Sequence, residues 1–204
     1  MKQAWRFEKG LHQTGNGLYA WLQPDGGWGW SNAGLIVDGD QSLLVDTLFD
    51  AKLTQEMLDV MSDVAGISAA EINTVVNTHA NGDHTHGNGL CTSAEVIASA
   101  ASAREMEAFT PQMMQGFMDA ADQLGDAGLY LKEIFGPFDF RQVAEKLPTR
   151  TFSGDLQLQV GGKRVELIEV GPAHTRGDVL VYVPEDKTVF TGDILFIDGT
   201  PLMW

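Results

Sequence analysis

The first part of the chain alternates apolar and polar positions, a pattern typical of strands that are buried on one face. It predicts strands at residues 17–23, 31–37 and 42–46. Apolar positions at helical spacing follow at 51–65 and stop before Gly66, which predicts an amphipathic helix covering one face of a sheet. The β-branched run 72–76 then predicts a buried strand. Strands, a helix and a strand in this order indicate an α/β layer.

Beyond residue 94 the pattern becomes mainly helical before it returns to strands. Residues 95–98 predict a short strand, and helical spacing predicts a helical insertion at roughly 100–136. Its apolar side chains give a soft, adaptable surface formed by Met106, Phe109, Met113, Met114, Phe117 and Met118. If this surface is a lid over the site, it would bind an apolar substrate group. If it belongs to the core or to a homodimer contact, it needs no ligand. We favour the core or the homodimer contact. Strands are again predicted at 156–160, 165–170, 179–183 and 188–191.

The composition is that of an ordinary globular chain. Of 204 residues, 44% are apolar and 20% are charged, enough for one sizeable core, and we expect a single domain over residues 1–204. No stretch approaches the roughly 20 apolar residues of a membrane helix. The first ten residues lack the apolar core of a signal peptide, and the single cysteine, Cys91, fits a reducing compartment, so we expect a cytoplasmic protein.

The formal net charge of −15 restricts the possible partners. Nucleic acids and anionic membranes are polyanions, and proteins bind them through clusters of Lys and Arg. We therefore expect neither as a partner and favour a small-molecule substrate.

The segment 77–88 follows the predicted buried strand and concentrates side chains that bind metals. Three histidines and one aspartate fall within eight positions: His79, Asp83, His84 and His86. Neutral imidazole and carboxylate are ligands of zinc, manganese and iron. If the segment is extended, residues two apart project to one side, so His79 and position 81 could hold one ion while Asp83 and His84 serve another. The alternative is a solvated polar turn, because these residue types are common in turns.

Two later segments repeat the arrangement of a strand that runs into a turn containing glycine. Residues 170–178 place His174 at such a turn, and residues 189–193 end in Gly192 and Asp193. Three strand ends that each present ligand side chains predict a shared metal site. Asp46 also ends an apolar strand, where it could orient a ligand histidine or cap the following helix.

These three segments resemble the motifs of the metallo-β-lactamase superfamily, and the resemblance covers nearly the whole chain. It implies an α/β fold of the αββα type, with two mixed β-sheets and helices on the outside. It also implies a zinc centre of one or two ions, with iron or manganese as alternatives. The implied ligands are His79 and His174 for the first metal, Asp83 and His84 for the second, and Asp193 as the bridge.

Two features depart from the family pattern. Asn81 stands where the family has its second motif histidine, and because asparagine is a poor zinc ligand we expect a weakened first metal site. The family's last ligand histidine lies on a later loop, but only eleven residues follow Asp193 and none is histidine. We therefore expect a C-terminally truncated member in which the end of the second sheet is missing and exposed apolar surface favours a homodimer. His86 could replace the absent ligand or pack beside the site.

The chemistry that the resemblance implies is hydrolysis. A metal-bound hydroxide would attack an activated acyl bond, such as an ester, lactone, thioester or lactam, and Asp83 would orient the water or carry its proton to the leaving group. One alternative is an iron-dependent redox member of the same superfamily. The other is a catalytically impaired fragment that acts as a binding module.

Overall fold

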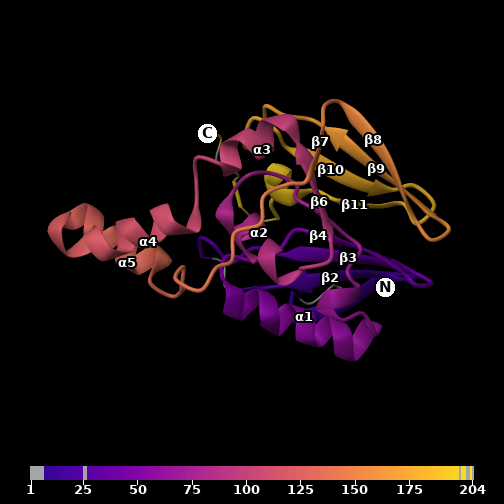
Figure 1. Ribbon diagram of the computed structural model, residues 1–204, viewed down its shortest axis with the longest axis horizontal. Coiled ribbons are helices and arrows are strands. Elements are labelled where there is room, and N and C mark those ends of the chain that lie inside the picture. The colour runs from indigo at the N-terminus through magenta and orange to yellow at the C-terminus, as the bar shows by residue number, and fades with distance from the viewer. Residues whose placement is uncertain (1–6, 25–26, 198, 201–202, 204) are drawn as a thin grey trace.

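The computed structural model describes residues 7–24, 27–197, 199–200 and 203, and its body consists of two β-sheets packed face to face (Figure 1). The first sheet has seven strands in chain order: β1 (Gly10–Gly15), β2 (Leu18–Leu22), β3 (Ala33–Asp38), β4 (Gln41–Val45), β5 (Thr74–Val76), β6 (Glu95–Ser99) and β7 (Arg150–Phe152). The second sheet has the order β11-β10-β9-β8: β8 (Asp155–Val160), β9 (Lys163–Glu169), β10 (Val179–Val183) and β11 (Thr188–Phe190). The prediction of two β-sheets is therefore confirmed.

The direction of neighbouring strands follows from how they are connected. In the first sheet, β1 to β4 are antiparallel, whereas β4 to β7 are parallel because helical segments connect them. All neighbours in the second sheet are antiparallel. Only the first sheet is mixed, contrary to the expectation of two mixed sheets, because the loops within the second are too short for a crossover.

Helix α1 (Ala51–Ala65) covers the outer face of the first sheet, and its two ends are capped. The Asp50 carboxylate accepts the backbone N–H of Leu53 at 2.7 Å, which satisfies a donor that the first helical turn leaves free. Gly66 ends the helix with a φ of 72°, and its N–H donates to the carbonyl of Ser62. The helix predicted over residues 51–65 is confirmed.

Two apolar cores lie on opposite faces of the first sheet. The first core fills the space between this sheet and α1 and includes Leu35, Leu44, Met57, Leu58, Met61, Val75 and Val96. The second core fills the space between the two sheets and includes Ile36, Leu43, Val76, Ile97, Val165, Leu167, Val179 and Val181. Successive strand residues such as Leu43 and Leu44 thus enter different cores. The central strands β4 and β5 are buried on both faces and give a rigid base to the loops that follow them.

Three helices between β6 and β7 form the predicted insertion: α3 (Ala100–Met106), α4 (Pro111–Ala120) and α5 (Asp126–Phe135). Helix α3 lies against β6 and β7, whereas α4 and α5 pack together and project from one side of the body (Figure 1). Met114 and Met118 pack against the first core, while Phe109 and Phe117 are exposed. No helix in the described part of the chain is long and apolar enough to cross a lipid bilayer.

Strands β1 and β7 were not predicted from the sequence. They are the two edge strands of the first sheet. Most of their residues are exposed or only partly buried, so the alternation of apolar and polar positions is weak. Their positions are set by backbone pairing with β2 and β6.

Candidate metal centre

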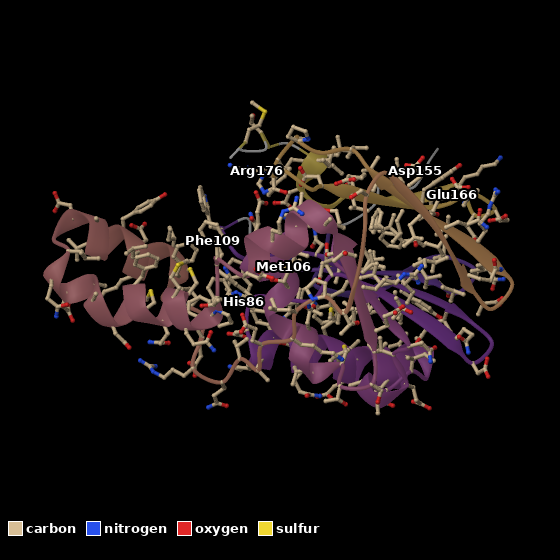
Figure 2. The ribbon with its side chains drawn as sticks, turned by 45° about the horizontal axis from the view of Figure 1, so that its top comes forward. His86, Met106, Phe109, Asp155, Glu166 and Arg176 are labelled. Atoms are coloured by element: carbon tan, nitrogen blue, oxygen red, sulfur yellow. The ribbon has the colours of Figure 1, made fainter. Side chains whose placement is uncertain are left out.

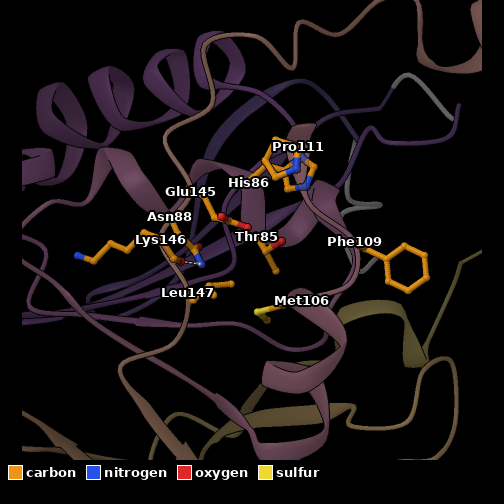
Figure 3. A pocket seen from close by; sticks show the side chains of 9 residues that line it. All are labelled: Thr85, His86, Asn88, Met106, Phe109, Pro111, Glu145, Lys146 and Leu147. Carbon is orange, nitrogen blue, oxygen red and sulfur yellow. Dashed lines mark hydrogen bonds between the residues drawn. The ribbon is translucent and has the colours of Figure 1, made fainter. Parts of the chain in front are cut away.

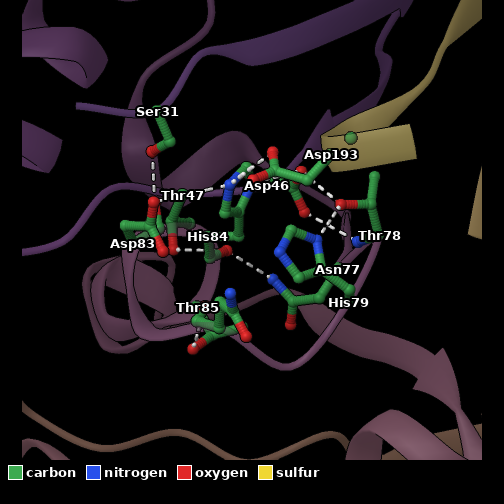
Figure 4. A network of polar contacts seen from close by, with 12 residues as sticks. Ser31, Asp46, Thr47, Asn77, Thr78, His79, Asp83, His84, Thr85 and Asp193 are labelled. Carbon is green, nitrogen blue, oxygen red and sulfur yellow. Dashed lines mark hydrogen bonds and ion pairs between the residues drawn. The ribbon is translucent and has the colours of Figure 1, made fainter. Parts of the chain in front are cut away.

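The predicted ligand residues meet at one end of the two sheets, where the loops after β4, β5, β9 and β11 converge. Figure 4 shows His79, Asp83, His84 and Asp193 together with Asp46. Because the carboxyl ends of the parallel strands β4 and β5 lie at the same edge, Asp46 comes next to the segment that carries His79 and His84. The second sheet adds His174 after β9 and Asp193 in the short helical turn η4 (Gly192–Ile194). The site therefore lies at the boundary between the sheets.

Asp46 is the buried centre of the polar network in Figure 4. Its Oδ1 accepts the N–H of Thr78 at 2.7 Å, and its Oδ2 accepts the Thr78 hydroxyl at 2.8 Å. The same Oδ2 lies 2.9 Å from Nδ1 of His84. Its φ of 63° lies in the left-handed region, which aspartate tolerates better than most residues. Asp46 thus orients a histidine, whereas the cap of the following helix is Asp50.

These contacts determine which ring nitrogen of each histidine faces the site. The Thr78 hydroxyl has one hydrogen and donates it to Asp46, so it can only accept from Nδ1 of His79, which is 3.0 Å away. His84 likewise uses its Nδ1 to donate to Asp46. In both rings Nε2 is the atom left to bind a cation.

His79, His84 and Asp193 each bring one possible ligand atom to a place where these atoms all lie within 4.8 Å of one another. Both rings are buried, and Nε2 of His79 has no hydrogen-bond partner among the described residues. Nε2 of His84 lies 3.2 Å from Oδ1 of Asp193. An unpaired buried polar atom is costly, and imidazole and carboxylate are common metal ligands. The three residues therefore fit a divalent cation.

The electrostatics of the cluster agree with this fit. Burial, together with the neighbouring His84, lowers the pKa of His79 well below its usual value. Burial would also lower the pKa of His84, but the carboxylates of Asp193, Asp83 and Asp46 outweigh it and raise this pKa well above its usual value. Burial would raise the pKa of Asp193, yet the nearby imidazoles, His84 first, lower it. The carboxylates around His84 thus require a positive charge, which a proton or a bound cation supplies.

Asp83 lies at the edge of the cluster and is only partly buried. Its Oδ2 is 3.7 Å from Nε2 of His84. Burial raises the pKa of its carboxyl group, and the negative charge of Asp193 adds to this shift while His84 opposes it. Its backbone carbonyl accepts a hydrogen bond from the hydroxyl of Ser31, so the loop between β2 and β3 is anchored here.

Asn81 and His174 form a second polar contact at the same place. Nδ2 of Asn81 lies 3.1 Å from Nε2 of His174. The same Nε2 lies 3.6 Å from Oδ2 of Asp193, and the His174 ring stands edge-on to that of His79 with 4.9 Å between centroids. The structure therefore brings all five predicted ligands together and sets Asn81 against one of them.

The ligand segment is not extended along its whole length, contrary to the interpretation from the sequence. After Asn81 it forms a helical turn, α2 (Gly82–Thr85), followed by the 3-10 turn η2 (His86–Leu90). Alternate positions can share a side only up to Asn81, because the helical turn redirects Asp83 and His84. His84 is then able to reach Asp46 and Asp193 from one position.

Two buried amides, which the sequence patterns did not indicate, hold this segment in place. The Asn77 and Asn88 side chains exchange hydrogen bonds of 3.1 and 2.8 Å. The Asn77 amide and the N–H of Thr47 both donate to the carbonyl of His84, each at 2.9 Å. The backbone of His84 is thus fixed independently of its ring. Asn77 comes directly after a buried strand, and a buried amide needs hydrogen-bond partners. This position in the sequence could have indicated that the Asn77 side chain holds the following segment.

His86 follows the cluster in sequence, and its side chain lies at a small pocket with Met106 and Phe109 (Figures 2 and 3). Its ring centroid lies 5.4 Å from that of Phe49 and 6.0 Å from that of Phe140. Neither ring nitrogen makes a hydrogen bond within the described part of the chain. The ring borders a cavity of about 20 Å³, which is enough for one water molecule and is also lined by Met106 and Phe109. His86 therefore packs against aromatic rings at a pocket that Glu145 and Lys146 also line, and it lies outside the three-residue ligand cluster.

We expect His86→Leu to stabilise the protein at acidic pH. Burial lowers the pKa of His86 to about 4, whereas an unfolded histidine has a pKa of about 6.5, so unfolding takes up a proton between these values. The free energy of unfolding of the wild type therefore falls by up to about 3 kcal/mol as the pH falls through this window. Leucine takes up no proton, so the variant does not show this loss. Urea unfolding of both proteins at pH 8 and pH 5 measures this. The advantage of the variant should grow toward pH 5, and an advantage independent of pH would contradict the prediction.

Comparison with known proteins gives both a family and relatives. A model of the metallo-beta-lactamase superfamily matches residues 26–204. The hydroxyacylglutathione hydrolase of Brucella ovis is 38% identical over 82 residues, which cover 35% of this chain and 32% of that protein. The matched stretch thus spans about a third of the length of the curated relatives.

Solved structures share the fold. A metallo-beta-lactamase from Pontibacter korlensis has a TM-score of 0.63 at 18% identity, over 90% of this chain and 71% of the other. A metallo-beta-lactamase from Hirschia baltica has a TM-score of 0.58 at 17% identity, over 89% and 69%. At these identities the likeness concerns the fold alone, and the expected two-sheet architecture is confirmed.

Proposed function

Since this chain belongs to the metallo-β-lactamase superfamily, we propose that it is a metal-dependent hydrolase of activated acyl bonds. The observation that carries the proposal is the pair of buried Nε2 atoms, of His79 and His84, beside the carboxylate of Asp193. Such a set suits a divalent ion, and we favour zinc over iron and manganese because two imidazoles and one carboxylate are also the ligands of zinc hydrolases, and hydrolysis needs no redox-active metal. The family match and the likeness to a hydroxyacylglutathione hydrolase support hydrolytic chemistry.

A zinc ion bound here would supply Lewis acidity, which lowers the pKa of water and polarises a carbonyl group. The proton is handled by the chain itself. Asp83 lies 3.7 Å from Nε2 of His84 at the partly exposed edge of the cluster, and burial raises the pKa of its carboxyl group. A carboxylate of raised pKa is suited to take a proton from the attacking water and to pass it to the leaving group. Asp46 meanwhile holds the His84 ring in one orientation.

We propose a thioester as the leading substrate class. The relative from Brucella ovis is named for the hydrolysis of hydroxyacylglutathione, a thioester, and its matched stretch is 38% identical to this chain. Lactones, esters and lactams carry acyl bonds that are cleaved by the same attack on a carbonyl carbon. The net charge of −15 disfavours highly anionic substrates.

The test is an assay of zinc-loaded protein with four substrates, namely a hydroxyacylglutathione thioester, a lactone, an aryl ester and a β-lactam. We expect hydrolysis of at least one, with loss on chelation and recovery when zinc is restored. Asp83→Asn should lower kcat by about 10²- to 10⁴-fold while zinc content is retained. His12→Ala changes a histidine on the edge strand β1, which carries none of the proposed ligands, and should behave as the wild type. If zinc-loaded protein hydrolyses none of the four, the proposal is wrong.

The proposal also includes a cytoplasmic location and a small-molecule substrate. Cys91 is unpaired and buried, and burial raises the pKa of its thiol to about 11, so the chain has no structural need for an oxidising compartment. Fractionation of cells that produce the native protein tests this, and recovery outside the cytoplasm would contradict it.

A further inference from the structure

We propose that the centre holds a single metal ion, bound by His79, His84 and Asp193. Asn81 and His174 form a hydrogen-bonded pair outside the coordination shell of that ion. This arrangement differs from the two-ion centre that the sequence resemblance implies, in which His174 is a ligand of the first ion. The inference rests on the proposed function, because it concerns the metal that the hydrolase uses.

The first step concerns the atom that His174 would need for a metal. Its Nε2 lies 3.1 Å from Nδ2 of Asn81. An amide nitrogen can only donate, so Nε2 of His174 accepts and its lone pair is occupied. If the amide is rotated so that its oxygen faces the ring, Nε2 must carry a hydrogen and again has no lone pair to offer. In either orientation the hydrogen bond competes with metal binding at His174.

The second step concerns the number of ligand atoms that remain. Nδ1 of His84 is bound to Asp46, so this ring has one nitrogen, Nε2, for a metal. The His79 and His84 rings are neighbours, with 4.3 Å between their centroids. Nε2 of His79 lacks a hydrogen-bond partner in the described part of the chain, and Nε2 of His84 lies 3.2 Å from Oδ1 of Asp193, the carboxylate that would share the ion with it. These two atoms and a carboxylate oxygen of Asp193 make up the three-ligand cluster.

The third step is that a second ion would lack ligands. Since one imidazole nitrogen binds one metal ion, His84 cannot serve both a first and a second ion. Once His84 joins His79 at the first ion, the second would retain only Asp83 and a shared oxygen of Asp193. Sites of protein-bound zinc have at least three protein ligands. One ion per chain is therefore the occupancy that this set of side chains supports.

The experiment counts metal and identifies its ligands without any assay of turnover. Apo-protein is loaded with excess zinc, desalted and analysed for zinc per chain, and histidine ring nitrogens are followed by ¹H–¹⁵N NMR during the titration. We expect one zinc per chain, with large ¹⁵N shifts for His79 and His84 on binding and a small one for His174. Two zinc ions per chain, or a ¹⁵N shift of His174 equal to that of His79, would overturn the inference.

Variants sharpen the result. His174→Gln keeps a hydrogen-bonding partner for Asn81 and should retain one zinc with an affinity within about threefold of the wild type, whereas His79→Gln should weaken binding at least 100-fold. Asn81→His removes the competing amide and adds an imidazole, so it should raise the content to two zinc ions. Equal weakening by His174→Gln and His79→Gln would contradict the proposal. Thermal melts of the apo-variants show whether each has folded.

The two proposals fail in different ways. A protein that binds one zinc but hydrolyses no acyl substrate would refute the hydrolase and leave the single-ion centre standing. A protein that hydrolyses a thioester with two bound zinc ions would refute the single-ion centre and leave the hydrolase standing.

Discussion

His84→Gln is expected to abolish zinc binding at micromolar concentrations and with it all zinc-dependent hydrolysis. The His84 ring contacts Asp46 on one side and Asp193 and Asp83 on the other. Glutamine can still donate its amide N–H to Asp46, but the amide oxygen that then faces the site is a poor zinc ligand compared with an imidazole nitrogen. The loop itself should persist, because the carbonyl of His84 is held by Thr47 and Asn77 whatever its side chain. Titration with a chromophoric zinc chelator as competitor measures the loss.

Asp46→Asn should weaken zinc binding less than His84→Gln does. It leaves Nε2 of His84 in place and keeps a side chain that tolerates a φ of 63°, but it removes the charge that orients the ring. Partners of metal-binding histidines contribute about 10- to 100-fold to affinity, so this variant should lose less than His84→Gln. His12→Ala is the matched control and should bind zinc as the wild type does. Equal affinity of Asp46→Asn and wild type would show that Asp46 does not act through the ring.

Gly192→Ala is expected to destabilise the protein and to displace Asp193. Gly192 has a φ of 49°, where alanine costs about 1–2 kcal/mol. A Cβ atom here would lie 2.5 Å from Oγ1 and 2.8 Å from Cβ of Thr78. Thr78 cannot easily move away, because both its N–H and its hydroxyl are bonded to Asp46. Overpacking costs a further 1–3 kcal/mol or so, and we expect a total of roughly 2–5 kcal/mol in urea unfolding, with weakened zinc binding.

Gly39→Ala separates the cost of the left-handed backbone conformation from the cost of the steric clash. Gly39 lies in the turn between β3 and β4 with a φ of 63°, but an added Cβ would meet nothing within 4 Å. This variant therefore tests the backbone term alone and should lose about 1–2 kcal/mol with unchanged zinc affinity. If Gly192→Ala costs no more than Gly39→Ala and binds zinc normally, the contact with Thr78 does not position Asp193.

The central elements were predictable from the sequence because local signals agree there with burial. Residues 51–65 combine helical spacing with Gly66 after the helix, and this cap is used in the structure, whereas the N-terminal cap is Asp50 and not Asp46, the residue that the sequence suggested. The period-two strands fill the two cores as expected. Edge strands β1 and β7 could not be predicted, because their positions depend on pairing with a neighbour and their burial is slight.

The candidate site was predictable in its residue types but not in its connections. His79, Asp83 and His84 stood out because they crowd one short segment. His84 contacts both Asp46 and Asp193 because a helical turn follows Asn81. This turn is too short to produce a periodic pattern of apolar positions in the sequence. The pairing of Asn81 with a histidine from the other sheet is a long-range contact, and no local pattern encodes it.

The proposed ligands of the centre come from both sheets, so the cluster is complete only after both sheets have been made. A ribosome releases the chain from its N-terminus, so His79 and His84 emerge long before Asp193. The first sheet can assemble around β4 and β5 while the carboxylate that completes the cluster is still unsynthesised. Binding of the proposed metal ion would then be a late event, which follows the docking of the second sheet onto the first.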